Sequence, residues 1–246
     1  MLELNCDMGE IEVFMKNGHD ASLMPYLDSV NIACGFHAGS EKQMRYTIEK
    51  ALKHNLKIGA HPGFNDSPNF GRKEILLSHK EIKNLITIQL FILSEIAEEF
   101  SVKLNHVKPH GALYNISAKN HEYANAIAEA VFGFSEDLIL VGLSGSKSIE
   151  EAQKIGLKTM NEVFADRYYR TDQSLAARTG GGVIEDLNLI ELQVESFLEN
   201  RPVKTIEGTN IQLNAETICI HSDTPNALKI AQNVSEKVRL FYQSTT

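Results

Sequence analysis

The sequence has no tryptophan and only three cysteines, Cys6, Cys34 and Cys219, in 246 residues. An odd, low number of cysteines without regular spacing argues against a disulfide framework and is typical of a reducing compartment. We expect all three to be small buried apolar groups within predicted strands. A nucleophilic Cys6 is the less favoured interpretation, because its thiolate would need a cationic neighbour.

Basic residues are also scarce, since 24 Lys and Arg stand against 32 Asp and Glu, for a net charge of −8. This balance, without any basic run, argues against nucleic acid or an anionic membrane as a partner, although a local cationic pocket for a small anion remains compatible with it. The apolar run "LITIQLFIL" is too short to span a bilayer, and "MLELNCDMGE" does not have the pattern of a signal peptide. The sequence therefore predicts a soluble cytoplasmic protein.

Several catalytic and binding motifs are missing as well. There is no HExxH, no CxxC pair and no complete G-x-x-x-x-G-K-[ST] loop. The segment "GLSGSKS" at 142–148 lacks that spacing, but backbone amides ahead of a helix remain one way to bind an anion. Whether a metal is bound stays open: Asp7, His37 and His61 are one candidate set of ligands, with no local motif to support it.

Short apolar segments alternate with helical patterns along the chain, and 43% of the residues are apolar, enough for a full core. Strand followed by helix, repeated about seven times, predicts parallel strands with right-handed crossovers, in a barrel or in a doubly wound open sheet. The predicted strands are 2–6, 29–34, 57–61, 104–108, 138–143, 158–164 and 217–221.

Local signals mark some of the element boundaries. Ser78 and Glu81 have the spacing of a capping box at the start of a long helix. Thr224 and Pro225 predict the N-cap and first residue of the last helix. The segment 203–213 interrupts the alternation and predicts an appended β-hairpin. No linker or repeat divides the chain, so we expect one domain over residues 1–246.

Ionisable residues and glycines follow almost every predicted strand. In a parallel α/β fold the carboxyl ends of the strands meet on one face, where active sites are built. Each element alone is a weak signal, because a strand-end histidine is more often a hydrogen-bonding residue, and Asp223 could simply cap the last helix. The candidate site residues are Asp7, Glu10, His37, His61, Arg72, Lys108, His110, Glu162, Asp166, Arg167, His221 and Asp223.

Six of these segments, in order from about residue 2 to residue 228, resemble the LamB/YcsF family, the 5-oxoprolinase A subunits of bacteria and archaea. They are "LNCDMGE", "NIACGFHAGS", "GAHPGF…FGR", "HVKPHGALYN", "EVFADR" and "ICIHSDTPNAL". The resemblance implies an irregular TIM-like (β/α)7 barrel of the glycoside hydrolase/deacetylase type. It also implies ATP-dependent hydrolysis of the 5-oxo-L-proline lactam to L-glutamate, with partner subunits B and C.

By the same resemblance, ATP is a co-substrate accompanied by Mg²⁺, and we expect a partner subunit to supply part of its site. The resemblance implies that all of the candidate site residues except Arg72 line the site, and the demands of the reaction divide the candidates into two groups. The expected catalytic residues are Asp7, His61, Lys108, His110, Asp166 and Asp223. The expected substrate- or phosphate-binding residues are Glu10, His37, Arg72, Glu162, Arg167 and His221.

The chain departs from the family pattern in its loops. It has "GEIEVFMKNGHD" where the family has "GEGFG" and then a tryptophan, and it has Ser40, Ala177, Ser222 and Asn226 at positions where other residues are usual. None of these departures removes a candidate catalytic residue. Two alternatives remain open: a metal-dependent deacetylase of small carbohydrates, and a non-catalytic scaffold subunit.

Overall fold

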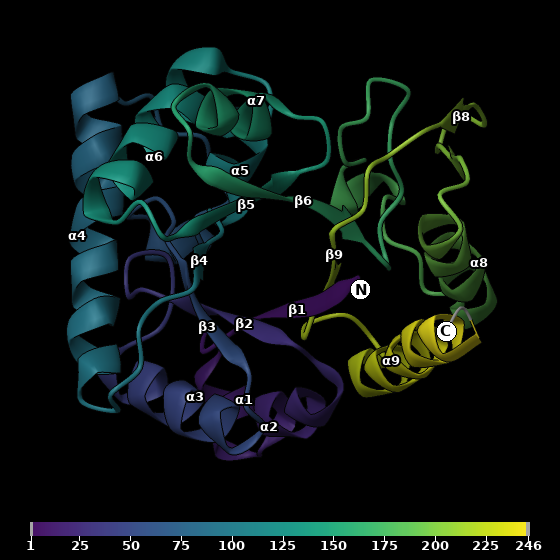
Figure 1. The fold of residues 1–246 in the computed structure, drawn as a ribbon, viewed down its shortest axis with the longest axis horizontal. Coiled ribbons are helices and arrows are strands. Elements are labelled where there is room, and N and C mark those ends of the chain that lie inside the picture. The colour runs from purple at the N-terminus through teal and green to yellow at the C-terminus, as the bar shows by residue number, and fades with distance from the viewer. Residues whose placement is uncertain (1, 245–246) are drawn as a thin grey trace.

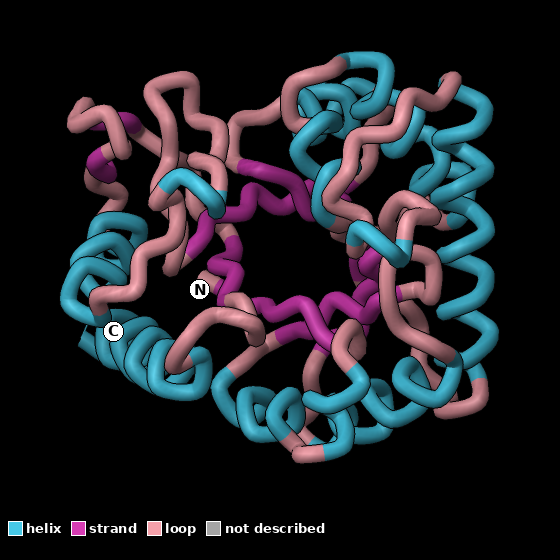
Figure 2. Tube along the Cα trace, turned by 180° about the vertical axis from the view of Figure 1, so that it is seen from behind, coloured by secondary structure: helices cyan, strands magenta, loops and turns pink. Residues whose placement is uncertain are grey.

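The computed structural model describes residues 2–244, and within them seven parallel strands close into a barrel. The barrel closes because β9 pairs with both β1 and β6, so the last strand completes the ring (Figure 2). This confirms the predicted TIM-like barrel and excludes an open sheet. The barrel strands are β1 (Glu3–Met8), β2 (Ser29–Ala33), β3 (Lys57–His61), β4 (His106–Val107), β5 (Ile139–Leu143), β6 (Lys158–Phe164) and β9 (Thr217–Ile220).

Helices surround the ring of strands, as Figure 1 shows. Because both faces of the strands are covered, β2 and β9 are buried along their whole length. The long α4 packs against α6 and α3, and α8 packs against α9. The helices are α1 (Glu12–Lys16), α2 (His19–Leu23), α3 (Glu41–Lys53), α4 (His79–Glu98), α5 (Gly111–Ser117), α6 (His121–Phe134), α7 (Lys147–Lys154), α8 (Leu187–Leu198) and α9 (Ala227–Ser244).

Polar side chains, rather than only apolar ones, fill part of the barrel interior. His106 Nε2 lies 2.7 Å from Asn31 Oδ1, and the Asn31 amide donates to Asn5 and Asp7 at 2.8 Å each. His106 fits because residue 59 is glycine: a Cβ there would lie 2.0 Å from His106 Nε2. These buried hydrogen bonds lead from the middle of the barrel to the carboxyl end of β1 and fix Asp7 in place.

The helix boundaries test the capping signals. Ser78 and Glu81 form both hydrogen bonds of the predicted capping box at the start of α4. The predicted start of the last helix is wrong, because α9 begins at Ala227, two residues after Pro225. The Thr224 hydroxyl donates instead to Asp166 Oδ2, at 2.6 Å. A residue predicted to have only a local role in a helix start thus joins two strand ends.

The predicted hairpin is present as β7 (Val203–Lys204) and β8 (Asn210–Ile211), which pair antiparallel. It follows α8 and lies outside the barrel (Figure 1). Between β6 and α8 the chain forms a long loop, residues 165–186, held by isolated bridges between Arg167 and Val183 and between Tyr169 and Leu175. Within the described residues, no helix is both long and apolar enough to cross a membrane.

Candidate functional site

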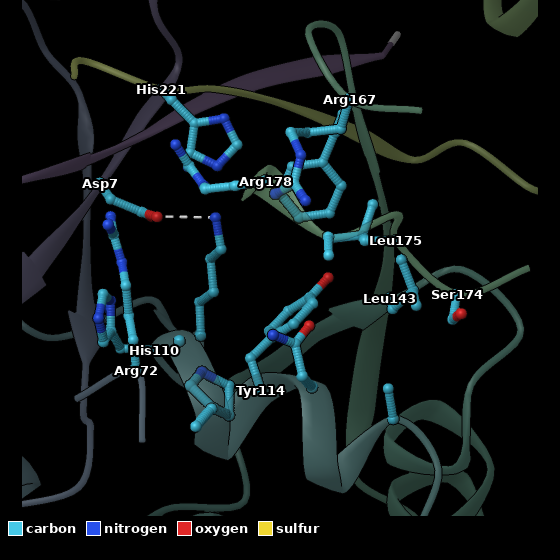
Figure 3. Close-up of a pocket in the computed structure, with 18 of the residues that line it drawn as sticks. Asp7, Arg72, His110, Tyr114, Leu143, Arg167, Ser174, Leu175, Arg178 and His221 are labelled. Atoms are coloured by element: carbon cyan, nitrogen blue, oxygen red, sulfur yellow. Dashed lines mark hydrogen bonds and ion pairs between the residues drawn. The ribbon is translucent and has the colours of Figure 1, made fainter. Parts of the chain in front are cut away.

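A cavity of about 670 Å³ opens at the carboxyl ends of the strands, within the size range of small-molecule sites. Side chains from several strand ends point into it, as the close-up in Figure 3 shows. All twelve sequence-predicted residues except His37, Glu162 and Asp166 line it. Those three lie directly behind lining residues, so the structure brings the whole set to one end of the barrel.

A buried cation lies on the floor of this cavity. Lys108 Nζ lies 2.9 Å from Asp7 Oδ1 and 2.8 Å from Glu162 Oε1, and its side chain is only 3% exposed. Burial by itself lowers the pKa of Lys108, but the charges of Asp7 and Glu162, together with Cys219, outweigh it and raise the pKa well above its usual value. Lys108 therefore stays charged and acts as a fixed positive group rather than as a base.

Asp7 is the carboxylate that faces both Lys108 and the histidines. Burial raises its pKa, but His61 and Lys108 outweigh this effect, so the pKa of Asp7 lies well below its usual value. Its side chain keeps 15% exposure, and Oδ2 lies 3.3 Å from His61 Nε2. Asp7 is therefore ionised, fixed by its partners and still in contact with the cavity.

Three histidines and one glutamate form a compact group beside Asp7, which we call the His₃Glu cluster: Glu10, His37, His61 and His110. Glu10 Oε1 lies 3.0 Å from His37 Nε2 and 3.1 Å from His110 Nδ1. The rings of His37 and His110 stack, with centroids 3.8 Å apart. Burial lowers the pKa of His37 to about 4, so His37 is neutral at pH 7.

His221 forms a second, separate histidine system. Its Nδ1 lies 2.8 Å from Asp166 Oδ1, and Asp166 also accepts the Thr224 hydroxyl. Burial raises the pKa of Asp166, but His221 outweighs that effect and the pKa falls below its usual value. His221 thus donates its Nδ1 proton to the Asp166 carboxylate, and its Nε2 remains available to a molecule in the cavity. Asp166, predicted as catalytic, lies behind the cavity and positions His221.

Cationic side chains also line the cavity, and we call them together the cationic wall: Arg72, Lys119, Arg167, Arg170 and Arg178. Arg167 is mostly committed to structure, because its guanidinium donates to the carbonyls of Gly182 and Ala176 in the 165–186 loop. Arg178 and Arg72 both reach Asp223, at 3.5 and 3.2 Å. Asp223, predicted as catalytic, therefore lies between two arginines at the cavity wall.

Arg178 and Tyr114 are two of the lining residues that the sequence-based set did not include. Arg178 lies in the long loop, where no strand end marks it; a basic residue among glycines was the available signal. Tyr114 lies four residues after His110, on the first turns of α5, and therefore on the same side of that helix. Burial and the charge of Glu162 raise the pKa of Tyr114 well above its usual value, which keeps its hydroxyl protonated.

These contacts bear on two alternatives that the sequence left open. The 142–148 segment does not offer its amides to an anion, because Ser144, Gly145 and Ser146 donate theirs to Glu162, Asn161 and Leu143. The metal candidate set of Asp7, His37 and His61 stays a hypothesis: Glu10 and His110 lie beside the two histidines, and Asp7 lies 3.3 Å from His61 Nε2 and 2.9 Å from Lys108 Nζ.

The cysteines are buried and free, as predicted. Burial raises the pKa of Cys6 well above its usual value, with the charge of Asp7 adding to the effect. The same holds for Cys219, although its Sγ lies only 3.1 Å from Lys108 Nζ, because burial outweighs the neighbouring cation. Neither thiol is therefore a thiolate at neutral pH, so the nucleophilic interpretation of Cys6 finds no support in its surroundings.

A closed parallel barrel with a polar cavity at the carboxyl ends of its strands is the architecture of TIM-like barrel enzymes. Within that class, the LamB/YcsF family model matches residues 2–242, and the chain belongs to this family. It is 44% identical to the 5-oxoprolinase A subunit of Staphylococcus carnosus (strain TM300), over 96% of this chain and 94% of that protein.

Two further comparisons agree with this placement. The chain is 43% identical to the 5-oxoprolinase A subunit of Shouchella clausii (strain KSM-K16), over 95% of this chain and 92% of the relative. Among solved structures, the lactam utilization protein of Thermus thermophilus superposes with a TM-score of 0.89 at 37% identity, over 97% of this chain and 96% of that one. The relatives therefore match this chain over nearly its whole length.

Proposed function

We propose that this chain is the A subunit of an ATP-dependent 5-oxoprolinase, which hydrolyses the 5-oxo-L-proline lactam to L-glutamate. The names of the relatives support the substrate class, since two are 5-oxoprolinase A subunits and one is a lactam utilization protein. The observation that carries the proposal is the Lys108 ammonium, held at 2.9 Å from Asp7 and 2.8 Å from Glu162 on the cavity floor.

The reaction explains why such a site needs ATP. A five-membered lactam is a resonance-stabilised amide, and the free energy change of its hydrolysis is unfavourable or close to zero. Transfer of the γ-phosphoryl group to the lactam oxygen forms an O–P bond, releases ADP and activates the ring carbon. One water then adds to that carbon, the ring C–N bond breaks and the nitrogen takes up a proton. A second water cleaves the resulting acyl phosphate, which yields glutamate and phosphate.

The cavity offers a group for each of these demands. Lys108, a fixed cation in a buried position, stabilises negative charge that develops on the substrate oxygens. Asp7 is ionised and accepts the proton of the attacking water. His221 lines the cavity with Nε2 free of Asp166 and is the candidate to protonate the ring nitrogen. General acid–base catalysis of this kind contributes roughly 10²–10⁴-fold.

The cationic wall suits the negative groups of the substrate. A 5-oxoproline carboxylate or a phosphoryl group would face Arg72, Arg170 and Arg178, whose guanidinium groups bind such oxygens in pairs. This wall and the ionised Asp7 lie on different elements, so a substrate between them has its anionic end and its reacting carbon held separately. Positioning of that kind is the main contribution of a protein to phosphoryl-transfer chemistry.

We further propose that ATP, with its Mg²⁺, binds mainly on a partner subunit. The sequence has no complete nucleotide-binding motif, and the amides of residues 144–146 are already used within the fold. The relatives are named as one lettered subunit of an enzyme, which supports the presence of partners, and we take these to be subunits B and C. On this proposal the isolated chain does not hydrolyse ATP by itself.

The decisive experiment measures ADP and glutamate release from 5-oxoproline, first with this chain alone and then with subunits B and C. We expect both products only in the complete mixture. Lys108→Ala and Asp7→Ala should then abolish glutamate formation while the subunits still assemble in size-exclusion chromatography. Unchanged glutamate formation by both assembled variants would show that this chain is a scaffold and would contradict the proposal.

A second candidate function is metal-dependent deacetylation of small carbohydrates, and the His₃Glu cluster is the observation that favours it. A metal-bound water could attack an acetyl group as it does in other hydrolases. The candidates separate in one assay of the chelated and metal-loaded chain without partners: acetate release from acetylated amino sugars supports deacetylation. Glutamate release only with partner subunits supports the lactam reaction.

A further inference from the structure

We propose that the His₃Glu cluster of Glu10, His37, His61 and His110 binds one divalent transition-metal ion. The four residues come from three strand ends and from the loop after β1, and each offers one ligand atom within 4.8 Å of the others. Proximity alone does not make a metal site. The positions that the ring protons of the histidines must take are what point to a metal.

His61 has its outer ring nitrogen tied to the backbone. Nδ1 lies 2.7 Å from the carbonyl oxygen of Lys108, and a carbonyl only accepts, so Nδ1 carries the proton. In the neutral ring, Nε2 then has a lone pair, and Nε2 faces both the cluster and Asp7, 3.7 Å from Glu10 Oε1 and 3.3 Å from Asp7 Oδ2. A histidine whose second nitrogen donates to a carbonyl has the orientation of a metal ligand.

His110 is also tied to a backbone carbonyl, but through Nε2, so that its Nδ1 is the atom that faces the cluster. Nε2 lies 2.8 Å from the carbonyl oxygen of Phe70 and therefore carries the proton. The lone pair is left on Nδ1, which lies 3.0 Å from His61 Nε2. Two neutral rings fixed in this way direct two lone pairs at each other, and Glu10 adds a carboxylate oxygen 3.1 Å from His110 Nδ1. Only a cation between these acceptors, either a metal ion or a proton, makes the arrangement favourable.

The spacing and packing of the cluster fit a metal ion. Ligand atoms bound at about 2.0–2.2 Å from a metal ion in a tetrahedral site lie about 3.4 Å from one another. In the cluster, ligand atoms lie 3.0 to 3.7 Å apart in four pairs: Glu10–His37, Glu10–His110, His61–His110 and Glu10–His61. His37 is held in place by two glycines. A Cβ at Gly63 would lie 2.6 Å from His37 Nδ1, and one at Gly71 would lie 2.7 Å from His37 Cβ.

The donor set indicates which ions the cluster prefers. Three imidazole nitrogens and one carboxylate oxygen suit Zn²⁺ and neighbouring first-row ions, whereas Mg²⁺ prefers oxygen ligands and an octahedral shell. The side chain of His37 is buried, and its Nε2 lies 3.0 Å from Glu10 Oε1 within the cluster. The proposed ion is therefore Zn²⁺ or a close relative, and it is distinct from the Mg²⁺ that accompanies ATP.

The test titrates the full chain, stripped with a chelator, with Zn²⁺ alone in a calorimeter. We expect one tightly bound ion per chain, weak competition by Mg²⁺, and at least about 100-fold weaker binding in His61→Gln and in His110→Gln. Circular dichroism monitors the folding of these variants. Glu10→Gln, in a loop after β1, is the variant least able to disturb folding, and it should also weaken binding.

The control removes the competing surface group of His121, Glu150 and Glu151, which also gathers ligand atoms within 4.8 Å. His121→Ala should leave the tight site unchanged. The proposal is overturned if tight binding is absent, if His121→Ala removes it, or if folded His61→Gln and Glu10→Gln chains bind as the unaltered chain does. In those cases a shared proton, rather than a metal, holds the cluster together. Because the readout is binding without substrate or partners, it does not depend on the lactam reaction.

Discussion

The two sides of the cavity are built differently. On one side, residues at the ends of β1, β3 and β4 are buried and joined by short contacts, as Lys108, Asp7 and His61 are. On the other side, Arg170 and Arg178 extend from the 165–186 loop, with side chains 56% and 30% exposed. We call the first the strand side and the second the loop side.

This difference indicates a division of labour. Groups on rigid strands and locked by hydrogen bonds hold the geometry that bond making and breaking require. Exposed arginines on a loop, held only by exposed ion pairs to Glu207 and Asp223, can exchange those partners for a substrate anion, so they suit recognition and capture. The strand side should therefore govern turnover and the loop side should govern substrate affinity, and single substitutions on each side can test that separation.

The largest effect should come from Lys108→Met. Losing the cation removes stabilisation of developing negative charge, so we expect kcat to fall about 10²–10³-fold or more in the reconstituted complex. The variant also leaves the buried carboxylates of Asp7 and Glu162 without their partner, which should cost about 3–5 kcal/mol of unfolding free energy in urea titrations. Lys103→Met, at an exposed position, is the matched control. Full activity of the Lys108→Met enzyme would show that the strand side does not take part in the chemistry.

Alanine at Arg178 or Arg170 should affect affinity instead. Each lost charge-assisted hydrogen bond is worth about 1.5–3 kcal/mol, so KM for 5-oxoproline should rise roughly 10–100-fold while kcat changes little. Steady-state kinetics of the reconstituted complex measures both constants. Arg45→Ala, on α3 and paired with Glu41 and Glu99, controls for loss of an arginine elsewhere. If kcat fell and KM did not, the loop side would belong to the catalytic machinery and the division would fail.

The residues of the strand side could be predicted from sequence, whereas Arg178 on the loop side could not, for a physical reason. Parallel strands bring their carboxyl ends together whatever the separation in sequence, so Asp7, His61 and Lys108 could be placed at one site in advance. Arg178 belongs to a loop whose path depends on bonds such as those from Arg167 to the carbonyls of Ala176 and Gly182. No periodicity in the sequence encodes such contacts.

Roles were harder to predict than positions. Asp166 looks in sequence like Asp7, since each follows a strand, yet it lies behind His221 while Asp7 faces the cavity. Which side of the barrel a strand-end residue faces depends on register and on the loop that follows. Thr224 shows the same limit, because its helix-cap pattern in sequence gave no sign of its hydrogen bond to Asp166.

His106, which lies inside the barrel, should make the free energy of unfolding depend on pH. Burial, with the charge of Lys108 adding to it, lowers the pKa of His106 to about 3, against about 6.5 in an unfolded chain. As the pH falls below 6.5 the unfolded state takes up a proton that the folded state refuses, so stability falls. The contribution of His106 is about 2 kcal/mol of lost stability between pH 7.5 and pH 5.

His106→Gln tests this contribution. Urea titrations at pH 7.5 and pH 5 should show a loss of stability that is smaller than in the unaltered chain by about 2 kcal/mol. The variant is expected to be less stable at both values, since His106 bonds Asn31 inside the barrel, so only the difference between them is informative. His54→Gln, at an exposed position, should keep the original difference. An unchanged difference in His106→Gln would place the acid sensitivity elsewhere.

The smallest effect should come from Asp223→Asn on the loop side. Asp223 pairs with Arg72 and Arg178 at 3.2 and 3.5 Å, and all three side chains are at least 30% exposed. Such pairs contribute at most about 1 kcal/mol, so the unfolding free energy should barely change. Removing the charge also frees two guanidinium groups, and KM for 5-oxoproline should stay equal or decrease slightly.

Asp172→Asn, at an exposed position in the 165–186 loop, is the control for loss of a carboxylate. The sequence grouped Asp223 with Asp7 as catalytic, and kinetics separates the two interpretations. A carboxylate that activates water would cost about 10²–10⁴-fold in kcat when neutralised. A carboxylate that only tethers two arginines leaves kcat unchanged. The first outcome would extend the catalytic machinery across the cavity, and the second would confine it to the side where the strands themselves hold the reacting groups.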